Sequence, residues 1–145
     1  AGPKDIIKAI GKIQSQSTSN PSSISQAAAV EALNGNQGFI QKRSKAFKER
    51  RDFVVKSLNN IKGINCLTPN GAFYVFPSCK GLLNKKTNLK TDTDFVQKLL
   101  EKSNVAVVQG SAFGLDGYFR ISYATSMQNL KKAMERIKTF CESLS

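Results

Sequence analysis

YFRISYATS, residues 118–126, is the most informative segment of this chain, because it reads as a buried strand that carries one arginine. Successive side chains of a strand point to opposite faces, so Arg120 lies opposite the apolar side chains. The apolar face holds Phe119, Ile121 and Tyr123, and the other face holds Tyr118, Arg120 and Ser122. A guanidinium stays charged and offers a planar fork of donors that matches a carboxylate. The second face is therefore a candidate lining for a polar pocket that binds an anion.

Two interpretations of Arg120 are open from these residues alone. Charged side chains that are buried in proteins are usually paired, and Asp116, four residues earlier, is the obvious partner for an internal ion pair. The other interpretation is an anionic ligand that the guanidinium binds away from bulk water. The surrounding sequence bears on this choice.

An apolar run over residues 105–108 predicts a second strand, and a glycine-bounded turn over residues 110–114 joins it to the arginine strand. The two pieces together, VAVVQGSAFG and GYFRISYATS, resemble the C-terminal segment of the class I pyridoxal-phosphate aminotransferases, most closely the bacterial-type aspartate aminotransferases. Two further stretches are similar to that family in the right order and at about the right spacing: QSQSTSNPSSISQAAAVEAL, residues 14–33, and NGAFYVFPS, residues 70–78. The resemblance covers essentially all 145 residues.

The resemblance implies an enzyme that transfers an amino group between L-aspartate and 2-oxoglutarate, with pyridoxal 5'-phosphate (PLP) as cofactor. In this family the cofactor is bound as a Schiff base on a lysine in a segment of the form Ser-Lys-x-x-x-x-x-Gly-x-Arg, which would precede Ala1. We therefore expect this polypeptide to be the carboxy-terminal piece of a longer enzyme. Because the protein's task in PLP catalysis is to place and tune the cofactor, we expect the piece alone to be inactive and to bind no PLP.

The resemblance also assigns roles to individual residues. Arg120 matches the arginine that binds the substrate α-carboxylate, and Phe73 would lie near the substrate. Ser19 and Asn20 match a loop that approaches the cofactor site of the neighbouring subunit in a homodimer, although simple turn chemistry explains them equally well. No catalytic residue is expected within the chain itself. One departure is Gln109, where the family usually has proline. Without the fixed φ of proline the turn would be looser, but no chemistry would be lost.

The expected fold class is α+β: the small domain of a fold-type I PLP enzyme, with a small, mainly antiparallel sheet covered by helices. Residues 1–36 would belong to the large cofactor-binding domain and residues 37–145 would form the small C-terminal domain, with a long interdomain helix over residues 37–58. The pattern further predicts helices over 3–13 and 23–33, a strand over 72–76, a helix that Thr91 or Asp92 caps, and a final helix that Thr125 and Gln128 open as a capping box.

The composition excludes several chemistries. The chain has no histidine, so it offers neither a histidine-activated nucleophile nor a histidine-containing zinc site. Its three cysteines are widely spaced without any C-x-x-C, which is typical of reduced thiols in a cytoplasmic protein. Neither a membrane span nor a signal-peptide hydrophobic region is apparent, and no metal site is expected.

A net charge of +12 makes a nucleic-acid-binding module the alternative of a different class. The basic residues are spread along the chain, and those of the first helix recur every four residues on one face, as in a solvated helix. The aromatic stretch GAFYVF, residues 71–76, lacks the leading basic residue and the second motif of RNA-recognition modules. An aminotransferase of another amino-acid specificity is the nearer alternative, because residues that select a second carboxylate would lie before Ala1.

Overall fold

The computed structural model describes residues 1–18, 20–84 and 86–144, and the chain divides into two compact units, Ala1–Gln41 and Lys42–Ser145. The first unit contains helices α1 (Lys4–Ser17) and α2 (Ser23–Asn34) and the start of α3 (Gly38–Asn59). These helices agree with the predicted ranges, although α1 runs one turn further than predicted. Gly35 ends α2, and its N–H donates to the carbonyl of Glu31.

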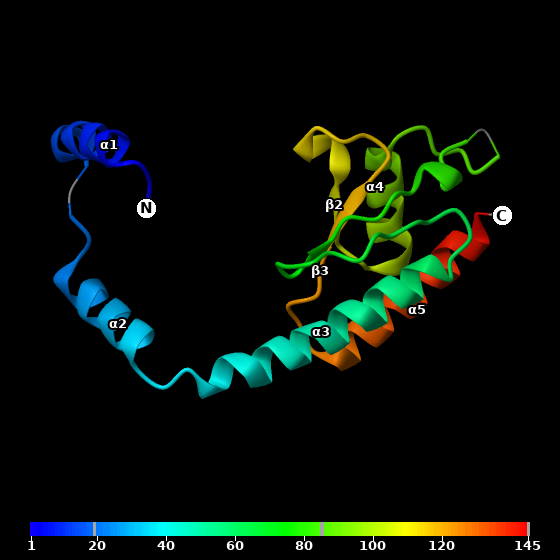
Figure 1. Cartoon of the computed structure of the whole chain (residues 1–145). Helices are drawn as coiled ribbons and strands as arrows, with labels where there is room; N and C mark the ends of the chain where they lie inside the picture. Colours follow the sequence, from blue (N-terminus) through cyan, green and yellow to red (C-terminus); the bar gives the residue numbers. More distant parts are fainter. Residues whose placement is uncertain (19, 85, 145) are drawn as a thin grey trace. The chain divides into compact units, whose positions relative to one another are not determined.

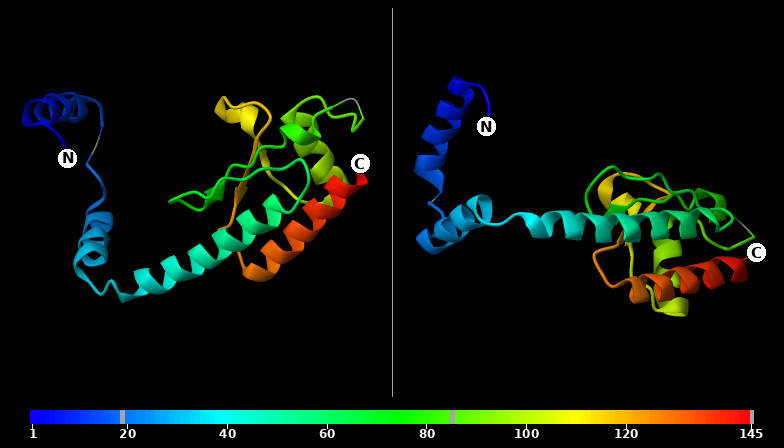
Figure 2. Two further views of the ribbon diagram at one scale, coloured as in Figure 1. Left: turned by 45° about the vertical axis from the view of Figure 1, so that its right-hand side comes forward. Right: turned by 60° about the horizontal axis from the view of Figure 1, so that its bottom comes forward.

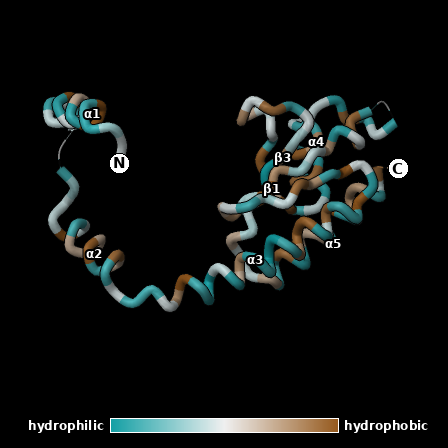
Figure 3. Tube along the Cα trace, in the orientation of Figure 1, coloured by the Kyte–Doolittle hydropathy of each residue, from teal (hydrophilic) through white to brown (hydrophobic). Residues whose placement is uncertain are grey.

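The first unit leaves its apolar side chains uncovered. None of the described residues of α1 and α2 is buried. Figure 3 shows hydrophobic positions along both helices, and the large exposed ones are Ile6, Ile7, Ile10, Ile13, Ile24, Val30 and Leu33. Burial of apolar surface is the main force that stabilises a fold. This unit therefore gains little of its stability from a core of its own.

The second unit is a small antiparallel sheet with helices packed around it. After α3 come β1 (Tyr74–Val75), the short 3₁₀ helix η1 (Lys80–Leu82) and α4 (Asp92–Ser103). Then follow β2 (Val108–Gln109), a second 3₁₀ helix η2 (Gly110–Phe113), β3 (Phe119–Ser122) and α5 (Met127–Ser143). Helices α3 and α5 run in the same direction in Figure 1 and in both views of Figure 2. The expected α+β class is confirmed.

The arginine strand β3 is the central strand, because the sheet order is β1-β3-β2 and both neighbours pair with it in the antiparallel sense. Tyr74 lies opposite Ser122 on one side of β3, and Val108 lies opposite Arg120 on the other. Both predicted outer strands are shorter than expected: residues 72–76 pair only at Tyr74–Val75, and the run 105–108 pairs only from Val108 onward.

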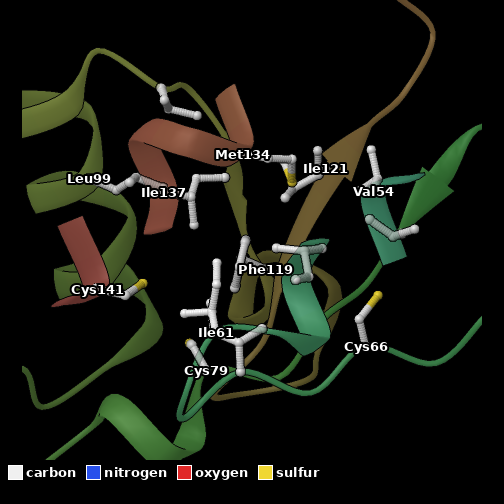
Figure 4. Close-up of a cluster of buried hydrophobic side chains, with 14 of the residues drawn as sticks. Val54, Ile61, Cys66, Cys79, Leu99, Phe119, Ile121, Met134, Ile137 and Cys141 are labelled. Carbon is white, nitrogen blue, oxygen red and sulfur yellow. The ribbon is translucent and has the colours of Figure 1, made fainter. Parts of the chain in front are cut away.

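The core lies on the apolar face of β3, where Phe119, Ile121 and Tyr123 are buried as the alternation predicts. Figure 4 shows Phe119 surrounded by Val54 of α3, Leu99 of α4, and Met134 and Ile137 of α5. A fully buried apolar side chain of this size contributes about 1.5–3 kcal/mol relative to an exposed one. This cluster therefore fixes the position of β3, and with it the position of Arg120 on the opposite face.

The helix caps explain why α4 and α5 begin where they do. Thr91 caps α4 as one of the two predicted residues: its Oγ1 accepts from the N–H of Asp94, whose carboxylate accepts in turn from the N–H of Thr91. The predicted capping box of Thr125 with Gln128 is wrong. Ser126 caps α5 instead, and its Oγ accepts from the N–H of Asn129, because the helix begins one residue later than the box requires.

Candidate functional site

Arg120 lies on the outward face of the central strand, half-buried, at the place where the sequence predicted a polar face. The ion pair with Asp116 is not formed. Among the described residues the ion pairs are Arg51 with Asp52 and Lys138 with Glu142, and the Arg120 guanidinium has neither an acidic partner nor a hydrogen bond there. A charged group that is partly removed from water without a partner is costly, so something else must hold it.

Two aromatic rings hold the guanidinium. Its central carbon lies 4.4 Å from the ring centroid of Tyr74 and 4.3 Å from that of Phe113. Both distances are well within the range of a cation–π contact, each of which contributes about 0.5–2 kcal/mol. Ring contacts use the faces of the guanidinium and leave its in-plane N–H donors free. The planar group is therefore oriented in advance, with donors available for a carboxylate.

The sheet register supplies the first ring. Because Tyr74 pairs with Ser122, it lies diagonally across from Arg120 on the same face of the sheet. Diagonal cross-strand neighbours are within reach of aromatic and long side chains. The same register buries Val75 opposite Ile121 on the core face. The core packing of β1 and β3 therefore also decides that Tyr74 contacts Arg120.

The turn η2 supplies the second ring, and backbone hydrogen bonds hold it. The Gly110 N–H donates to the Tyr118 carbonyl at 2.7 Å, and the Gly110 carbonyl accepts from the Leu115 N–H at 3.1 Å. The Ser111 N–H donates to the carboxylate of Asp92 at 2.7 Å. These bonds hold η2 against α4 and against Tyr118, the residue just before β3, and Phe113 at the end of η2 reaches the guanidinium.

A second aromatic group continues this face of the sheet. The rings of Phe76 and Tyr118 stack at 5.8 Å, and Phe76 meets Phe113 edge-on at 5.9 Å. The Lys80 ammonium lies 5.0 Å from the centroid of the Tyr118 ring. Edge-to-face and offset-stacked rings at these separations attract each other. The Phe76 ring therefore gives Phe113 an aromatic contact in addition to the guanidinium.

Phe73 lies one residue before β1 and is 42% exposed. Its ring packs on Tyr74 at 4.4 Å, and its carbonyl accepts from the Tyr123 N–H. Phe73 therefore lies beside one of the two rings that contact Arg120. The site also includes Tyr74, Phe113 and Asp92, which were not predicted for it from the sequence. Tyr74 and Phe113 nevertheless stand inside two of the motifs that carry the family resemblance.

Of the two residues expected near a cofactor, Ser19 lies outside the described residues. Asn20 is exposed in the first unit, where it lines a hollow of about 180 Å³ together with Gln14, Ser15 and Thr18. All of these side chains are uncharged. The phosphate of PLP calls for cationic side chains or converging backbone N–H groups, so this hollow by itself does not fit the cofactor, and the expected approach of Ser19 and Asn20 to the cofactor site of a neighbouring subunit stays a prediction.

The described residues hold no cluster of three or more metal-ligating side chains, and none of their helices is long and apolar enough to cross a membrane. The three thiols are buried. Burial raises the pKa of Cys66 to about 11, and burial together with the nearby Asp92 charge raises the pKa of Cys79 to about 12. The pKa of Cys141 is also raised to about 12, chiefly by burial. Since the thiolate is the reactive form, these cysteines are structural.

Comparison with known proteins gives the site its context. The family model "Aminotransferase class I and II" matches residues 1–137. An aspartate aminotransferase of Rhizobium meliloti is 57% identical over 148 residues, which cover 99% of this chain and 36% of that protein. A probable aspartate/prephenate aminotransferase of Rhizobium leguminosarum is also 57% identical, over 97% of this chain and 36% of its own length.

The fold of the chain also matches that of a solved relative. The crystal structure of the Rhizobium meliloti aspartate aminotransferase superimposes with a TM-score of 0.91 at 56% identity, over 100% of this chain and 37% of that one. The chain therefore spans little more than a third of the length of the relatives it matches. With its sequence, its small antiparallel sheet and its helices all in agreement, the chain belongs to the class I and II aminotransferase family.

Proposed function

We propose that this chain is the carboxy-terminal part of a PLP-dependent aminotransferase, and that Arg120 binds the α-carboxylate of the amino-acid and oxo-acid substrates. The observation that carries the proposal is the environment of the guanidinium: the rings of Tyr74 and Phe113 both contact it, and no acidic side chain among the described residues neutralises it. A ligand carboxylate would complete the site with two parallel charge-assisted hydrogen bonds.

The proposed reaction is amino-group transfer between L-aspartate and 2-oxoglutarate, supported by 57% identity with an aspartate aminotransferase. PLP would supply the electron sink in the full-length enzyme, and the described residues of this chain would contribute substrate binding. We propose Phe73 as an apolar neighbour of the bound substrate, because it packs on Tyr74 beside the guanidinium. Phenylalanine there would exclude water from the carboxylate contact and so strengthen it.

The remaining parts of the proposal concern organisation. Residues 1–36 would belong to the large domain, which is consistent with the exposed apolar side chains of α1 and α2. Residues 37–145 would form the small domain, and Ser19 and Asn20 would approach the neighbouring subunit of a homodimer. A cytoplasmic location completes the proposal and is supported by the family resemblance.

A second candidate concerns specificity rather than reaction class. Relatives of this chain include proteins described as aspartate/prephenate aminotransferases, one of them 51% identical over the whole chain. Arg120 would bind the α-carboxylate of either substrate in the same way. Steady-state kinetics with aspartate and with prephenate as alternative substrates separates the two candidates by their kcat/KM values.

The test of the Arg120 role is an Arg120→Ala variant in the full-length enzyme that contains this segment. Loss of charge-assisted hydrogen bonds that contribute about 1.5–3 kcal/mol should lower kcat/KM for aspartate by about 10- to 150-fold. Arg50→Ala is the matched control, because Arg50 also lies over an aromatic ring, that of Phe47 at 5.3 Å. The control should leave kcat/KM unchanged. A folded Arg120→Ala enzyme with wild-type kcat/KM would rule out the assignment.

A further inference from the structure

We propose that Asp92 is a positioning residue for the Arg120 site: its buried carboxylate anchors the turn η2 and thereby keeps the Phe113 ring on the guanidinium. This inference rests on the proposed function, in which Arg120 binds the substrate carboxylate. It assigns a role to a side chain of helix α4, whereas Arg120 lies on strand β3.

Asp92 is unusual among the described residues, because it is their only buried charged side chain, at 3% exposure. Such burial requires compensation, and the carboxylate accepts a 2.7 Å hydrogen bond from the backbone N–H of Ser111. Its position in the first turn of α4 adds favourable interaction with the helix dipole. The carboxylate therefore connects the start of α4 to a segment 19 residues further along the chain.

The start of α4 does not need Asp92 as a cap. Thr91 and Asp94 already form a complete capping box there. The Asp92 side chain instead reaches η2, so its contribution to α4 alone does not explain why a carboxylate is buried at this position. The geometry points to the turn as the element that the carboxylate serves.

The turn needs an external anchor. A 3₁₀ helix of four residues has few internal hydrogen bonds of its own, and the Phe113 ring at its end is 48% exposed. The bonds from Gly110 and to Gly110 tie the stem of the turn to Tyr118 and Leu115. The bond from Ser111 to Asp92 holds the turn against α4, two residues before Phe113.

The consequence reaches the substrate through Arg120. With Phe113 in place, two aromatic rings contact the guanidinium, at 4.4 Å and 4.3 Å, and together they restrict its orientation before a ligand arrives. Preorganisation of this kind improves binding because less side-chain freedom is lost on association. Without the anchor, Phe113 would move away from the guanidinium, which would lose one of its two ring contacts. The carboxylate contact would then weaken while the chemistry of the amino-group transfer is untouched.

The experiment compares variants of the full-length holoenzyme by steady-state kinetics and by titration with succinate, a dicarboxylate that cannot react. Asp92→Ala should raise KM for aspartate and Kd for succinate by about 3- to 10-fold, the change that corresponds to one lost cation–π contact, while kcat stays within about twofold. Asp92→Asn keeps an acceptor oxygen for the Ser111 N–H and should restore most of the affinity. A purely structural role for Asp92 would lower Tm without this split between KM and kcat.

Two further variants test whether Asp92 acts on Arg120 by way of the Phe113 ring. Phe113→Leu should raise KM and Kd as Asp92→Ala does, and the double variant should be no worse than either single one, because both remove the same ring contact. Thr91→Ala is the matched control, since it weakens the start of α4 but leaves the Ser111 bond in place. It should lower Tm with unchanged KM.

The outcomes separate this inference from the proposed function. If Arg120→Ala loses affinity while Phe113→Leu and a folded Asp92→Ala keep wild-type KM and Kd, the positioning role is overturned and the carboxylate role of Arg120 stands. If Arg120→Ala itself has no effect, the proposed function fails first. Should Asp92→Ala not fold, Phe113→Leu decides alone: unchanged KM and Kd in that variant overturn the proposal.

Discussion

Replacing Gly110 with alanine tests the close packing that places the turn η2. A Cβ at this position would meet the Leu115 carbonyl oxygen, and it would lie 2.8 Å from both the Cβ and the carbonyl oxygen of Tyr118. These are backbone atoms or the first side-chain atom, so no side-chain rotation relieves the overlap. The methyl group can be accommodated only if the turn moves away from Tyr118.

The cost follows from what that movement breaks. The Gly110 N–H donates to Tyr118 at 2.7 Å, and the Gly110 carbonyl accepts from Leu115 at 3.1 Å. Two weakened backbone hydrogen bonds cost about 0.5–1.5 kcal/mol each, and overpacking adds about 1–3 kcal/mol. Since part of the overlap is relieved as the bonds lengthen, the two costs do not add fully. We expect the free energy of unfolding to fall by about 2–4 kcal/mol.

Tyrosine fluorescence during urea unfolding measures this change selectively. The chain has no tryptophan, and its three tyrosines, Tyr74, Tyr118 and Tyr123, all lie in the second unit. The signal therefore reports the unit that contains η2. Gly71→Ala is the control, because a Cβ there has no atom within 4 Å, and it should change stability by less than about 0.5 kcal/mol. A Gly110→Ala variant as stable as this control would refute the argument.

Two further predictions concern the same unit. Thr91→Ala removes the oxygen that accepts from the Asp94 N–H at 3.1 Å and should lower the free energy of unfolding by about 0.5–2 kcal/mol. The control Thr93→Ala changes an exposed residue inside the helix and should not lower it. Equal losses of both variants in urea unfolding would contradict the capping role. Burial raises the pKa of Cys66 to about 11 and the pKa values of Cys79 and Cys141 to about 12. In the unfolded chain these thiols have pKa values of about 8.5. Between these pH values the folded chain therefore keeps the thiol protons that the unfolded chain releases. The stability that the protonated thiols contribute should therefore decline as pH rises from about 9 toward 12, and a thiol reagent at pH 8 should modify the cysteines only after urea is added; rapid modification of the native chain would contradict their burial.

The elements that hydrophobic periodicity governs could be predicted from the sequence. The alternation in residues 118–123 fixed both the burial of Phe119 and Ile121 and the outward position of Arg120. The extent of the outer strands could not be predicted, because an apolar run reports burial and not pairing. Val105 is buried without joining the ladder, after Asn104 ends α4 in the left-handed conformation at φ 53°.

The candidate site was predictable only in part. Arg120 was identified because a charge inside an apolar strand needs an explanation. Its partners were not identified, because the contact with Phe113 depends on where a short turn is placed by Asp92 from another helix. Local sequence carries no signal for such a long-range hydrogen bond. The sequence left an ion pair with Asp116 open, and the described ion pairs do not include it.

The pleat of β3 separates two kinds of mutational tolerance along four consecutive residues. Phe119 and Ile121 face the interior, so changes there are limited by volume and shape. Arg120 and Ser122 face outward, so changes there alter what the surface attracts while the packing beneath persists. Natural variation or directed evolution can therefore change ligand binding at every second position of this strand without disturbing the packing of the core.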